Sequence, residues 1–465
     1  MKEAKLESLA IAAFLERGEN RIPVTAKYAS KYSLWIKYLN DFSFTPDDTF
    51  KLIIPKNGTN LELCPCQLVL DPDQDGQNGR LVFLKDIVDV HKLLTQTQIS
   101  KLQSAFGDLS NLLTYKDKVK KSFKEYTADL TYDISVYKIL LDQIDLQYKD
   151  EPPSVKNVIQ KAIIETEGCN FNKFIDKSLF ELEAQVKYFS TEEHQIHSFY
   201  FRKQLWNFIM CSPLMARSNL KPRGYSGDSE IMKMLYSNEY LGDSTFAKLL
   251  QKHGVEHTAA QSVRNRINLI TQLLFNFQKK TLANPTDKLN ILSIGSGPAL
   301  ELQKILKSPQ DCCKFHFTLF DQDPVALSEA LGLSVKIGKQ LKASVDVDIF
   351  KGSVRTLLYS SPLKHKAEQF HYIYSLGLFD YLSAPVAKAL VSSLYRMLVH
   401  GGEMVIGNFH ISNPSKYYME YWCDWVLKLR SEDDLLEFTS DLSGSNYSII
   451  FENTKSQMFL HIKKS

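Results

Sequence analysis

The pattern of apolar and polar positions divides the chain into three regions, and the first has the spacing of short strands. From about residue 21 to residue 94, brief β-prone runs such as FKLIIPK and RLVFL alternate with turn-forming stretches such as TPDD and KNGTN. Runs of this length between such turns are typical of a small antiparallel barrel or sandwich. We therefore expect a β-rich domain over residues 1–95.

The second region, residues 96–285, has helical spacing and few glycines. Stretches such as VKNVIQKAIIE and AAQSVRNRINLITQLLFNFQKK repeat their apolar positions with the period of an amphipathic helix. We expect a helical region here that caps an active site in the region that follows.

The third region, residues 286–465, alternates strand-like apolar runs with helical segments. The runs are LNILSI, FHFTLF, VDVDIF, FHYIYSL and GEMVIGNF, and the last two, YSIIFE and QMFLHIK, have the spacing of a hairpin. Such alternation predicts an α/β fold in which helices cover both faces of a mostly parallel sheet with an antiparallel edge.

Composition and charge limit the classes of protein that fit this pattern. A chain of 465 residues that is 44% hydrophobic can bury the cores of two or three domains. Its formal charge of +3 is too small for this length to indicate a general nucleic-acid-binding surface, so we expect no nucleic-acid partner. No apolar window approaches the length of a membrane span.

Cysteine usage indicates a reducing compartment and no metal centre. The seven cysteines are odd in number and scattered, and no leader-like apolar segment opens the chain, so we expect a cytoplasmic protein. Cys64 and Cys66 form a CPC pair, but no second pair follows at zinc-ligand spacing. We therefore expect no metal site.

The stretch LSIGSGPALEL has the order strand, glycine turn, helix. Gly295 and Gly297 allow a tight turn and a close approach of the backbone to a ligand, and Pro298 suits the first turn of a helix whose amides face an anionic group. Leu300 stands where the dinucleotide fingerprint has its third glycine. The missing glycine argues against the pyrophosphate of NAD or FAD.

The ends of the next strands add polar groups at the same edge of the predicted sheet. Asp321 ends the second strand about twenty residues after the glycines, where a carboxylate can accept both hydroxyls of a ribose. Asp323 follows it and fits either a ligand or a helix cap. Ser353 and Val354 follow the third strand, where backbone groups can face an adenine edge. A nucleoside without pyrophosphate fits these features.

The order of these features resembles the class I S-adenosylmethionine-dependent methyltransferases, whose Rossmann-like sheet has seven strands with a reversed last strand. The resemblance implies that fold and S-adenosylmethionine as the cofactor. The residues that it implies for cofactor binding are Gly295, Ser296, Gly297, Asp321, Gln322, Ser353, Val354 and Ser375.

Three further stretches make the resemblance more specific: KPRGYSGDSEIMKMLY from Lys221, AAQSVRNRI from Ala259 and NFHISNPSKYYMEYWCDWVLKLR from Asn408. With LSIGSGPALEL and SLGLFDYL they resemble bacterial methyltransferases for the biosynthesis of 3-hydroxypalmitic acid methyl ester, an extracellular signal, over about residues 190–465. This implies methylation of a 3-hydroxy fatty acid carboxylate. A protein, a nucleic acid or another small molecule is the alternative acceptor, and a non-catalytic sensing module is the alternative class.

One position departs from the wider class. Ser293 stands where many members carry an acid before the first glycine, and that acid contacts the amino group of the cofactor. Asp228, in the helical region, is the candidate that would supply the missing negative charge.

Methyl transfer from a sulfonium is an in-line displacement, so the protein must mainly align the reactants and exclude water. A carboxylate acceptor is ionised at neutral pH, needs no strong base, and requires a cationic or hydrogen-bonding partner when buried. The candidates are Arg223, Tyr225, Arg264, Arg266, Tyr381, Asn408, His410, Asn413 and Tyr417. Of these, Arg264 and Arg266 lie on a predicted helix, and we expect them to be solvated or to bridge domains.

Four candidates form the predicted catalytic set: Arg223, Tyr225, Tyr381 and His410. Tyr225 lies between Gly224 and Gly227, which suggests a backbone bent for close approach. His410 fits a satisfied histidine at a strand end equally well, and it would become the general base if the acceptor were a hydroxyl or a nitrogen.

The N-terminal region weakly resembles PilZ domains, small barrels that bind cyclic di-GMP through arginines. The motif residues are RGENR from Arg17 to Arg21 and DFS from Asp41 to Ser43. Pro46 replaces the glycine expected after the serine, so we expect an interaction or dimerisation module rather than a cyclic di-GMP site.

Overall fold

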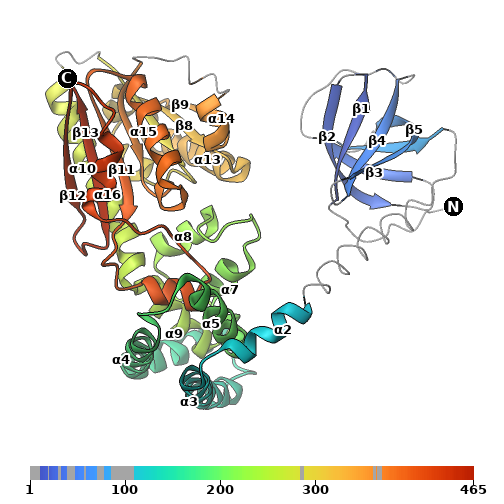
Figure 1. Ribbon diagram of the computed structural model, residues 1–465, viewed down its shortest axis with the longest axis vertical. Coiled ribbons are helices and arrows are strands. Elements are labelled where there is room, and N and C mark those ends of the chain that lie inside the picture. Colours follow the sequence, from blue (N-terminus) through green and yellow to red (C-terminus); the bar gives the residue numbers. More distant parts are fainter. Residues whose placement is uncertain are drawn as a thin grey trace. The chain divides into compact units, whose positions relative to one another are not determined.

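In the computed structural model of the protein, the described residues are 11–18, 20–29, 33–38, 45, 48–56, 59–70, 78–84, 109–282, 287–359, 363 and 369–465. The chain forms two compact units, 1–117 and 118–465. The first contains a β-barrel, and the second contains both a helical region and a large sheet, as Figure 1 shows.

The described strands of the first unit are β1 (Ile11–Arg17), β2 (Asn20–Ala29), β3 (Ser33–Tyr38), β4 (Thr49–Lys56), β5 (Thr59–Leu70) and β6 (Asn78–Phe83). They close into an antiparallel barrel in the order β1-β2-β3-β6-β5-β4, one of the two architectures that the strand pattern predicted. Alternate side chains, such as Leu52 and Ile54 on β4, are buried inside it, as the two-residue period of a strand requires.

The strand β1 lies outside the predicted strand-rich stretch, which began at about residue 21. Its sequence, IAAFLER, is short and ends in charged residues. It becomes a strand because it pairs with β2 and with β4, which closes the barrel.

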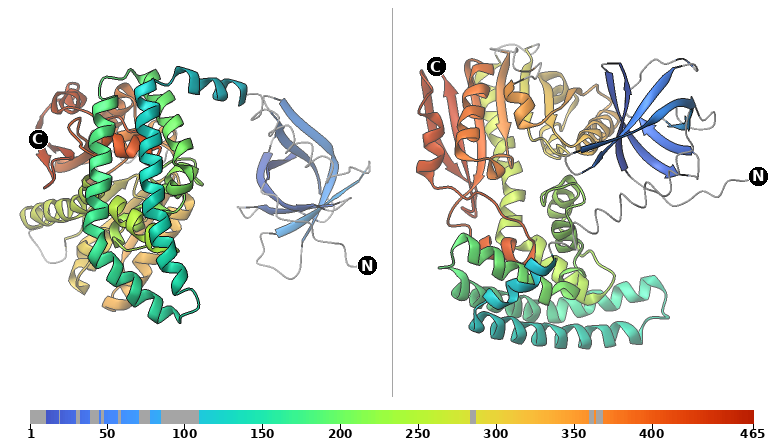
Figure 2. Two further views of the ribbon diagram at one scale, coloured as in Figure 1. Left: turned by 90° about the horizontal axis from the view of Figure 1, so that it is seen from below. Right: turned by 45° about the vertical axis from the view of Figure 1, so that its right-hand side comes forward.

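The helical region of the second unit is built around two long helices, α3 (Lys121–Gln147) and α4 (Pro153–Val186), which lie side by side in Figure 2. The buried residues of α3 include Phe123, Thr127 and Leu130, so one stripe of the helix packs on its neighbours. The other helices of this region are α5 (Thr191–Gln204), α6 (Trp206–Ile209), α7 (Pro213–Leu220), α8 (Ser229–Ser237), α9 (Thr245–Glu256) and α10 (Thr258–Thr281). The helix α2 (Leu109–Lys118) belongs to the first unit except for its last residue. Among the described helices, none combines the length and the apolar character that a membrane span requires.

The strands of the second unit are β7 (Leu289–Ile294), β8 (Phe315–Asp321), β9 (Asp346–Lys351), β10 (Phe370–Ser375), β11 (Leu398–Phe409), β12 (Ser445–Phe451) and β13 (Gln457–Lys464). They form one sheet in the order β12-β13-β11-β10-β7-β8-β9. β13 pairs antiparallel with both β11 and β12, whereas the pairs from β11 through β9 are parallel. The seven apolar runs therefore form the predicted strands, including the terminal hairpin.

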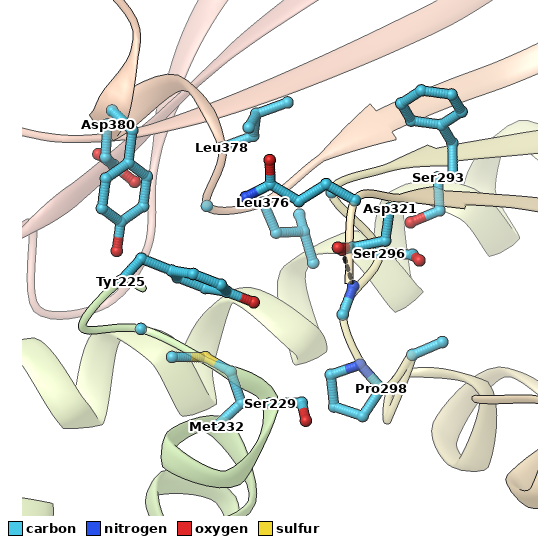
Figure 3. Close-up of a pocket in the computed structure, with 18 of the residues that line it drawn as sticks. Tyr225, Ser229, Met232, Ser293, Ser296, Pro298, Asp321, Leu376, Leu378 and Asp380 are labelled. Atoms are coloured by element: carbon cyan, nitrogen blue, oxygen red, sulfur yellow. Dashed lines mark hydrogen bonds between the residues drawn. The ribbon is translucent and has the colours of Figure 1, made fainter. Parts of the chain in front are cut away.

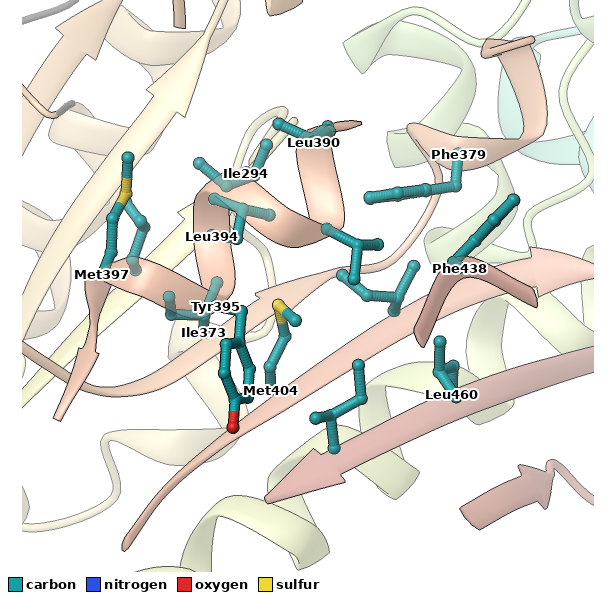
Figure 4. Close-up of a cluster of buried hydrophobic side chains, with 14 of the residues drawn as sticks. Ile294, Ile373, Phe379, Leu390, Leu394, Tyr395, Met397, Met404, Phe438 and Leu460 are labelled. Carbon is teal, nitrogen blue, oxygen red and sulfur yellow. The ribbon is translucent and has the colours of Figure 1, made fainter. Parts of the chain in front are cut away.

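Helices cover both faces of this sheet, as predicted. α10 and α13 (Pro324–Leu341) bury residues such as Leu274 and Leu327 on one face. α15 (Ala384–Met397) buries Leu390 and Leu394 on the other, in the cluster of Figure 4. Short helical elements complete the unit: α11 (Leu302–Ile305), α12 (Pro309–Lys314), α14 (Val354–Tyr359), α16 (Glu432–Leu436), η2 (Phe379–Tyr381) and η4 (Glu437–Thr439).

After β11 the chain leaves the sheet and packs on the helical region. The π-helical turn η3 (Tyr418–Trp422), orange-red in Figure 1, lies against α5. Arg202 of α5 donates to the Glu420 carbonyl oxygen at 2.8 Å and pairs with Asp424 at 2.9 Å. The sheet and the helical region are thereby joined in one unit, and this connection carries Trp425 toward the carboxyl edge of the sheet.

Candidate functional site

The glycine turn after β7 has the backbone conformation that its sequence predicts. Gly295 and Gly297 have φ values of +64° and +54°, which L-residues with a side chain rarely adopt. A Cβ atom on Gly295 would lie 3.1 Å from the Cβ of Leu378, whereas one on Gly297 would meet no atom within 4 Å. The turn thus packs closely on one side and faces open space on the other.

Asp321 ends β8 beside this turn and is only 7% exposed. Its Oδ2 accepts a hydrogen bond from the Gly297 amide at 2.8 Å, and its Oδ1 accepts one from the Asp323 amide at 2.9 Å. Burial raises the pKa of this carboxyl group, against the lowering effect of the amides. Because a carboxylate has about four acceptor sites, the Asp321 carboxyl group retains capacity for a ligand hydroxyl beside its backbone partners.

A cavity of about 460 Å³ lies at this edge of the sheet. Figure 3 shows the glycine turn and Asp321 on one side and Tyr225, Ser229 and Met232 of the helical region on the other. The predicted site residues that line the cavity are Tyr225, Gly295, Ser296, Gly297, Asp321, Gln322, Ser353, Val354 and Tyr381.

Two predicted site residues, Arg223 and Asp228, do not line the cavity in the described structure. Asp228 is fully buried, caps α8 through the Ile231 amide at 3.1 Å and pairs with Arg217 at 2.8 Å. Arg223 pairs with Asp323 at 2.8 Å. The sequence left open whether Asp323 binds a ligand or caps a helix, and the structure places it as the cap of α13.

Ser375 and His410 also lie outside the lining of this cavity. The Ser375 hydroxyl donates to the Ile294 carbonyl oxygen at 2.8 Å and joins β10 to β7. The His410 ring contacts the Ser412 hydroxyl at 2.6 Å and the Glu432 carboxylate at 3.0 Å. Hydrogen bonds thus tie both side chains to neighbouring elements of the second unit.

Aromatic side chains from separate elements meet at one end of the cavity. The Trp425 indole nitrogen donates to the Tyr381 hydroxyl at 2.8 Å. A Cβ on Gly227 would lie 2.7 Å from both Tyr381 and Trp425, so the loop before α8 passes this pair closely. Tyr225, from the same loop, also lines the cavity. Burial raises the pKa of the Tyr225 and Tyr381 hydroxyls, so both are neutral hydrogen-bonding groups at physiological pH.

Arg266 lines the cavity and is buried rather than solvated, and it bridges the helical region and the sheet, which was one of the two roles expected for it. It is 7% exposed, and its guanidinium donates to the Leu376 carbonyl oxygen at 3.0 Å and to the Met232 sulfur at 3.3 Å. A Cβ on Gly377 would lie 3.0 Å from the guanidinium, so the glycine provides the space. The neighbouring Arg264 instead donates to backbone carbonyl oxygens of Leu235 and Val255.

Two buried carboxyl groups in the cavity were not predicted as site residues. Glu301 is 5% exposed and accepts a hydrogen bond from the Tyr374 hydroxyl at 2.8 Å. Asp380 is 2% exposed and accepts one from the Phe409 amide at 2.7 Å. Burial raises the pKa of both, to about 6 for Asp380. Glu301 follows the turn at Gly295–Gly297, and Asp380 follows Gly377. These glycines are the one feature of the sequence that could have pointed to the two acids.

The buried charged residues of the cavity have an excess of acids. Asp321, Glu301 and Asp380 are carboxyl groups, and Arg266 is the buried guanidinium. Burial raises the pKa of all three carboxyl groups, so ionising them is costly unless a positive charge lies nearby. Such a cavity favours a cationic ligand and disfavours an anionic pyrophosphate.

Part of the PilZ-like motif, which suggested cyclic di-GMP as a ligand, lies among the described residues. Arg17 pairs with Asp48 at 2.6 Å and Arg21 pairs with Glu16 at 2.9 Å on the barrel. The Asp41–Ser43 stretch of the PilZ-like motif lies outside the described residues. Within the described part of the chain, no group of three or more histidine, cysteine or acidic residues is placed to hold a metal ion.

No protein-family model and no curated protein matches the chain. Among solved structures, a possible exported protein from Bordetella parapertussis aligns at 14% identity and a TM-score of 0.42, covering 68% of this chain and 99% of that one. Magnesium protoporphyrin IX methyltransferase from Synechocystis PCC 6803 with bound SAH aligns at 11% and 0.33, covering 45% and 88%. A SAM-dependent methyltransferase from Aquifex aeolicus aligns at 16% and 0.30, covering 42% and 88%. Likenesses this distant assign neither a ligand nor an activity to this chain.

Proposed function

We propose that the protein is an S-adenosylmethionine-dependent methyltransferase and that the cavity at the carboxyl edge of the sheet binds this cofactor. The observation that carries the proposal is the joint placement of Asp321, the glycine turn and the acid-rich buried charges in one cavity. A ribose needs the carboxylate at the strand end, and a sulfonium cation fits the excess of acids.

Further features of the cavity support this cofactor. The Ser296 hydroxyl lines the cavity, is buried and has no hydrogen-bond partner among the described residues, which is costly unless a ligand or water supplies one. Gly297 faces open space. Leu300 in place of a third glycine and the excess of carboxyl groups both disfavour NAD and FAD.

The cofactor would supply a methyl group on a sulfur that leaves readily as a neutral thioether. The residues of this chain would then have three tasks. Asp321 would hold the ribose, Tyr225 and the Tyr381–Trp425 pair would present aromatic groups to a positive charge, and the closure of the sheet edge by the helical region would exclude water.

For the acceptor we favour a carboxylate on an apolar tail, of the 3-hydroxy fatty acid class. No histidine lines the cavity in the described structure, and an ionised carboxylate needs no general base. Met232, Leu382 and Leu427 give the cavity part of an apolar surface. The volume of about 460 Å³ is in the range of a single drug-sized ligand, so a long tail would have to extend beyond it.

Calorimetric titration tests the cofactor. We expect S-adenosylhomocysteine to bind and NAD not to bind. Asp321→Asn should weaken S-adenosylhomocysteine binding by about tenfold or more, because a charge-assisted hydrogen bond to the ribose is lost. The matched control is Asp348→Asn, an exposed acid on β9 that does not line the cavity. Equal affinity of the Asp321 variant and the wild type would contradict the assignment.

Mass spectrometry tests the acceptor. The protein is incubated with S-adenosylmethionine and a panel of 3-hydroxy fatty acids, and the products are searched for the gain of one methyl group. Methyl esters would support the favoured acceptor. Methylation of an added protein, nucleic acid or other metabolite instead would replace it, and cofactor binding without any methylation would indicate a sensing module.

A further inference from the structure

The first observation concerns the acid that the glycine turn lacks. Ser293 stands before the turn where the resemblance leads one to expect an acid. Asp228, the predicted substitute, pairs with Arg217 and caps α8, and it does not line the cavity in the described structure. A ligand with an ammonium group would therefore need its negative partner from elsewhere in the cavity wall.

Glu301 is an acid that does lie in this wall. It is nearly completely buried, and its Oε1 accepts the Tyr374 hydroxyl at 2.8 Å. The ion pairs among the described residues do not include Glu301. A buried carboxylate with a single neutral side-chain partner is unfavourable, so Glu301 is ionised only when a cation completes its environment.

Arg266 is the buried cation of the same cavity. Its guanidinium donates to a carbonyl oxygen and a sulfur, both neutral, and its Nε has no hydrogen-bond partner among the described residues. It forms no ion pair with Glu301 or with any other described acid. Two opposite charges are therefore buried in one cavity, Glu301 after β7 and Arg266 on α10. They form no direct ion pair, although Arg266 lowers the pKa of Glu301 electrostatically.

An unpaired carboxylate and an unpaired guanidinium that line one cavity complement a zwitterion. A free α-amino acid group has this pattern, because its ammonium needs a carboxylate and its carboxylate needs a planar cationic donor. We propose that Glu301 and Arg266 bind the ammonium and the carboxylate of the amino-acid moiety of S-adenosylmethionine, so that Glu301 replaces the acid absent at position 293. This inference rests on the proposed function.

Two related ligands separate this inference from the proposed function. S-adenosylhomocysteine carries the amino-acid group, and 5′-methylthioadenosine has the same nucleoside and sulfur without it. Both are titrated into wild type and Glu301→Gln by calorimetry. Gln keeps an oxygen for the Tyr374 hydroxyl and removes the charge. We expect S-adenosylhomocysteine affinity to fall about tenfold or more and 5′-methylthioadenosine affinity to change less than about twofold.

Arg266→Gln should show the same selectivity, with a loss confined to S-adenosylhomocysteine. Normal binding of 5′-methylthioadenosine by either variant also demonstrates that its cavity is folded. The matched control is Glu403→Gln, because Glu403 is a buried glutamate of β11 that pairs with His461 at 2.9 Å and does not line the cavity. It should leave both affinities unchanged.

The remaining outcomes contradict either the role of Glu301 or the proposed function. If Glu301→Gln binds both ligands as the wild type does, or loses both to the same extent, Glu301 does not recognise the amino-acid group. If wild-type protein binds neither ligand, the proposed function itself fails, and the present inference fails with it.

Discussion

The two walls of the cavity differ in how they are made. The sheet wall consists of strand ends, where Gly297 and Asp321 are joined by a backbone-to-side-chain hydrogen bond of 2.8 Å. The helical wall consists of side chains, such as Tyr225 and Met232, that arrive from a loop and a helix more than fifty residues earlier in the chain. The first wall depends on local backbone conformation, whereas the second depends on how distant elements pack. We therefore expect the sheet wall, together with Arg266 of α10, to determine cofactor affinity, and the loop and helix that carry Tyr225 and Met232 to determine alignment of the acceptor.

The largest effect should come from the sheet wall. Gly297→Val puts a branched side chain at a φ of +54°, pointing into open space that the ligand would occupy. We expect S-adenosylhomocysteine affinity to fall about 100-fold, which is about 2.7 kcal/mol of binding free energy, in calorimetry on folded protein. Gly332→Ala is the control, since this α13 glycine also faces open space but has no positive φ. Wild-type affinity in the Val variant would show that the turn is not part of the cofactor site.

A smaller effect is expected where the helical wall is closely packed. Gly227→Ala adds a Cβ that would lie 2.7 Å from both Tyr381 and Trp425, and overpacking of this kind costs about 1–3 kcal/mol. Thermal denaturation should show the loss of stability, with methyl transfer more affected than S-adenosylhomocysteine affinity. Gly168→Ala on α4, where the nearest contact is an ordinary 3.5 Å, should not destabilise the protein. A Gly227 variant as stable as wild type would contradict the close packing.

The pH dependence of binding tests Asp380, a buried acid of η2 that lines the cavity. Burial raises its pKa to about 6, while the Phe409 amide and the guanidinium groups of Arg266 and Arg430 favour its ionised form. A cationic ligand binds the ionised carboxylate, so S-adenosylmethionine affinity should fall as the pH drops through about 6, by at most about tenfold per pH unit. Asp380→Asn should remove this dependence. An unchanged pH profile in the variant would exclude Asp380 as its source.

The same group should affect folding stability with the opposite sign. Its pKa is higher in the folded protein than in the unfolded chain, so the folded state binds more protons between the two values. The contribution of Asp380 to the free energy of unfolding therefore decreases as the pH rises from about 4 to about 6. Denaturant titrations of wild type and Asp380→Asn across this range should show the difference, and parallel curves would contradict it.

The smallest effect should come from the hydrogen bond between Trp425 and Tyr381. Tyr381→Phe removes the acceptor of the indole N–H at 2.8 Å, which is worth about 0.5–1.5 kcal/mol. Methyl transfer should slow a few-fold while S-adenosylhomocysteine affinity stays constant. Tyr395→Phe is matched to it, because that hydroxyl donates to the Ser443 and Gly444 carbonyl oxygens outside the cavity. A loss of cofactor affinity in Tyr381→Phe would show that this tyrosine contacts the cofactor rather than aligning the acceptor.

The sequence predicted the sheet wall better than it predicted the contacts that distant elements make. The seven strands of the sheet, the glycine turn and the position of Asp321 were predicted, because strand periodicity and turn conformation depend on neighbouring residues. Arg266 was expected to be either solvated or bridging, and the sequence could not decide between the two because a helical pattern does not reveal which neighbour covers each face. Ser375 and His410 have suitable residue types at strand ends, but their hydrogen bonds join them to the framework.

The sequence by itself therefore determined the order of elements, the edge of the sheet where a ligand would bind and the residues of the glycine turn. These are consequences of short-range backbone preferences and of the rule that parallel strands end at a common edge. Only the tertiary structure decided that Glu301, Asp380 and Arg266 are buried together while Asp228 is paired elsewhere. The physical reason is that the burial and pairing of a charge depend on elements distant in the chain, and no local pattern specifies them.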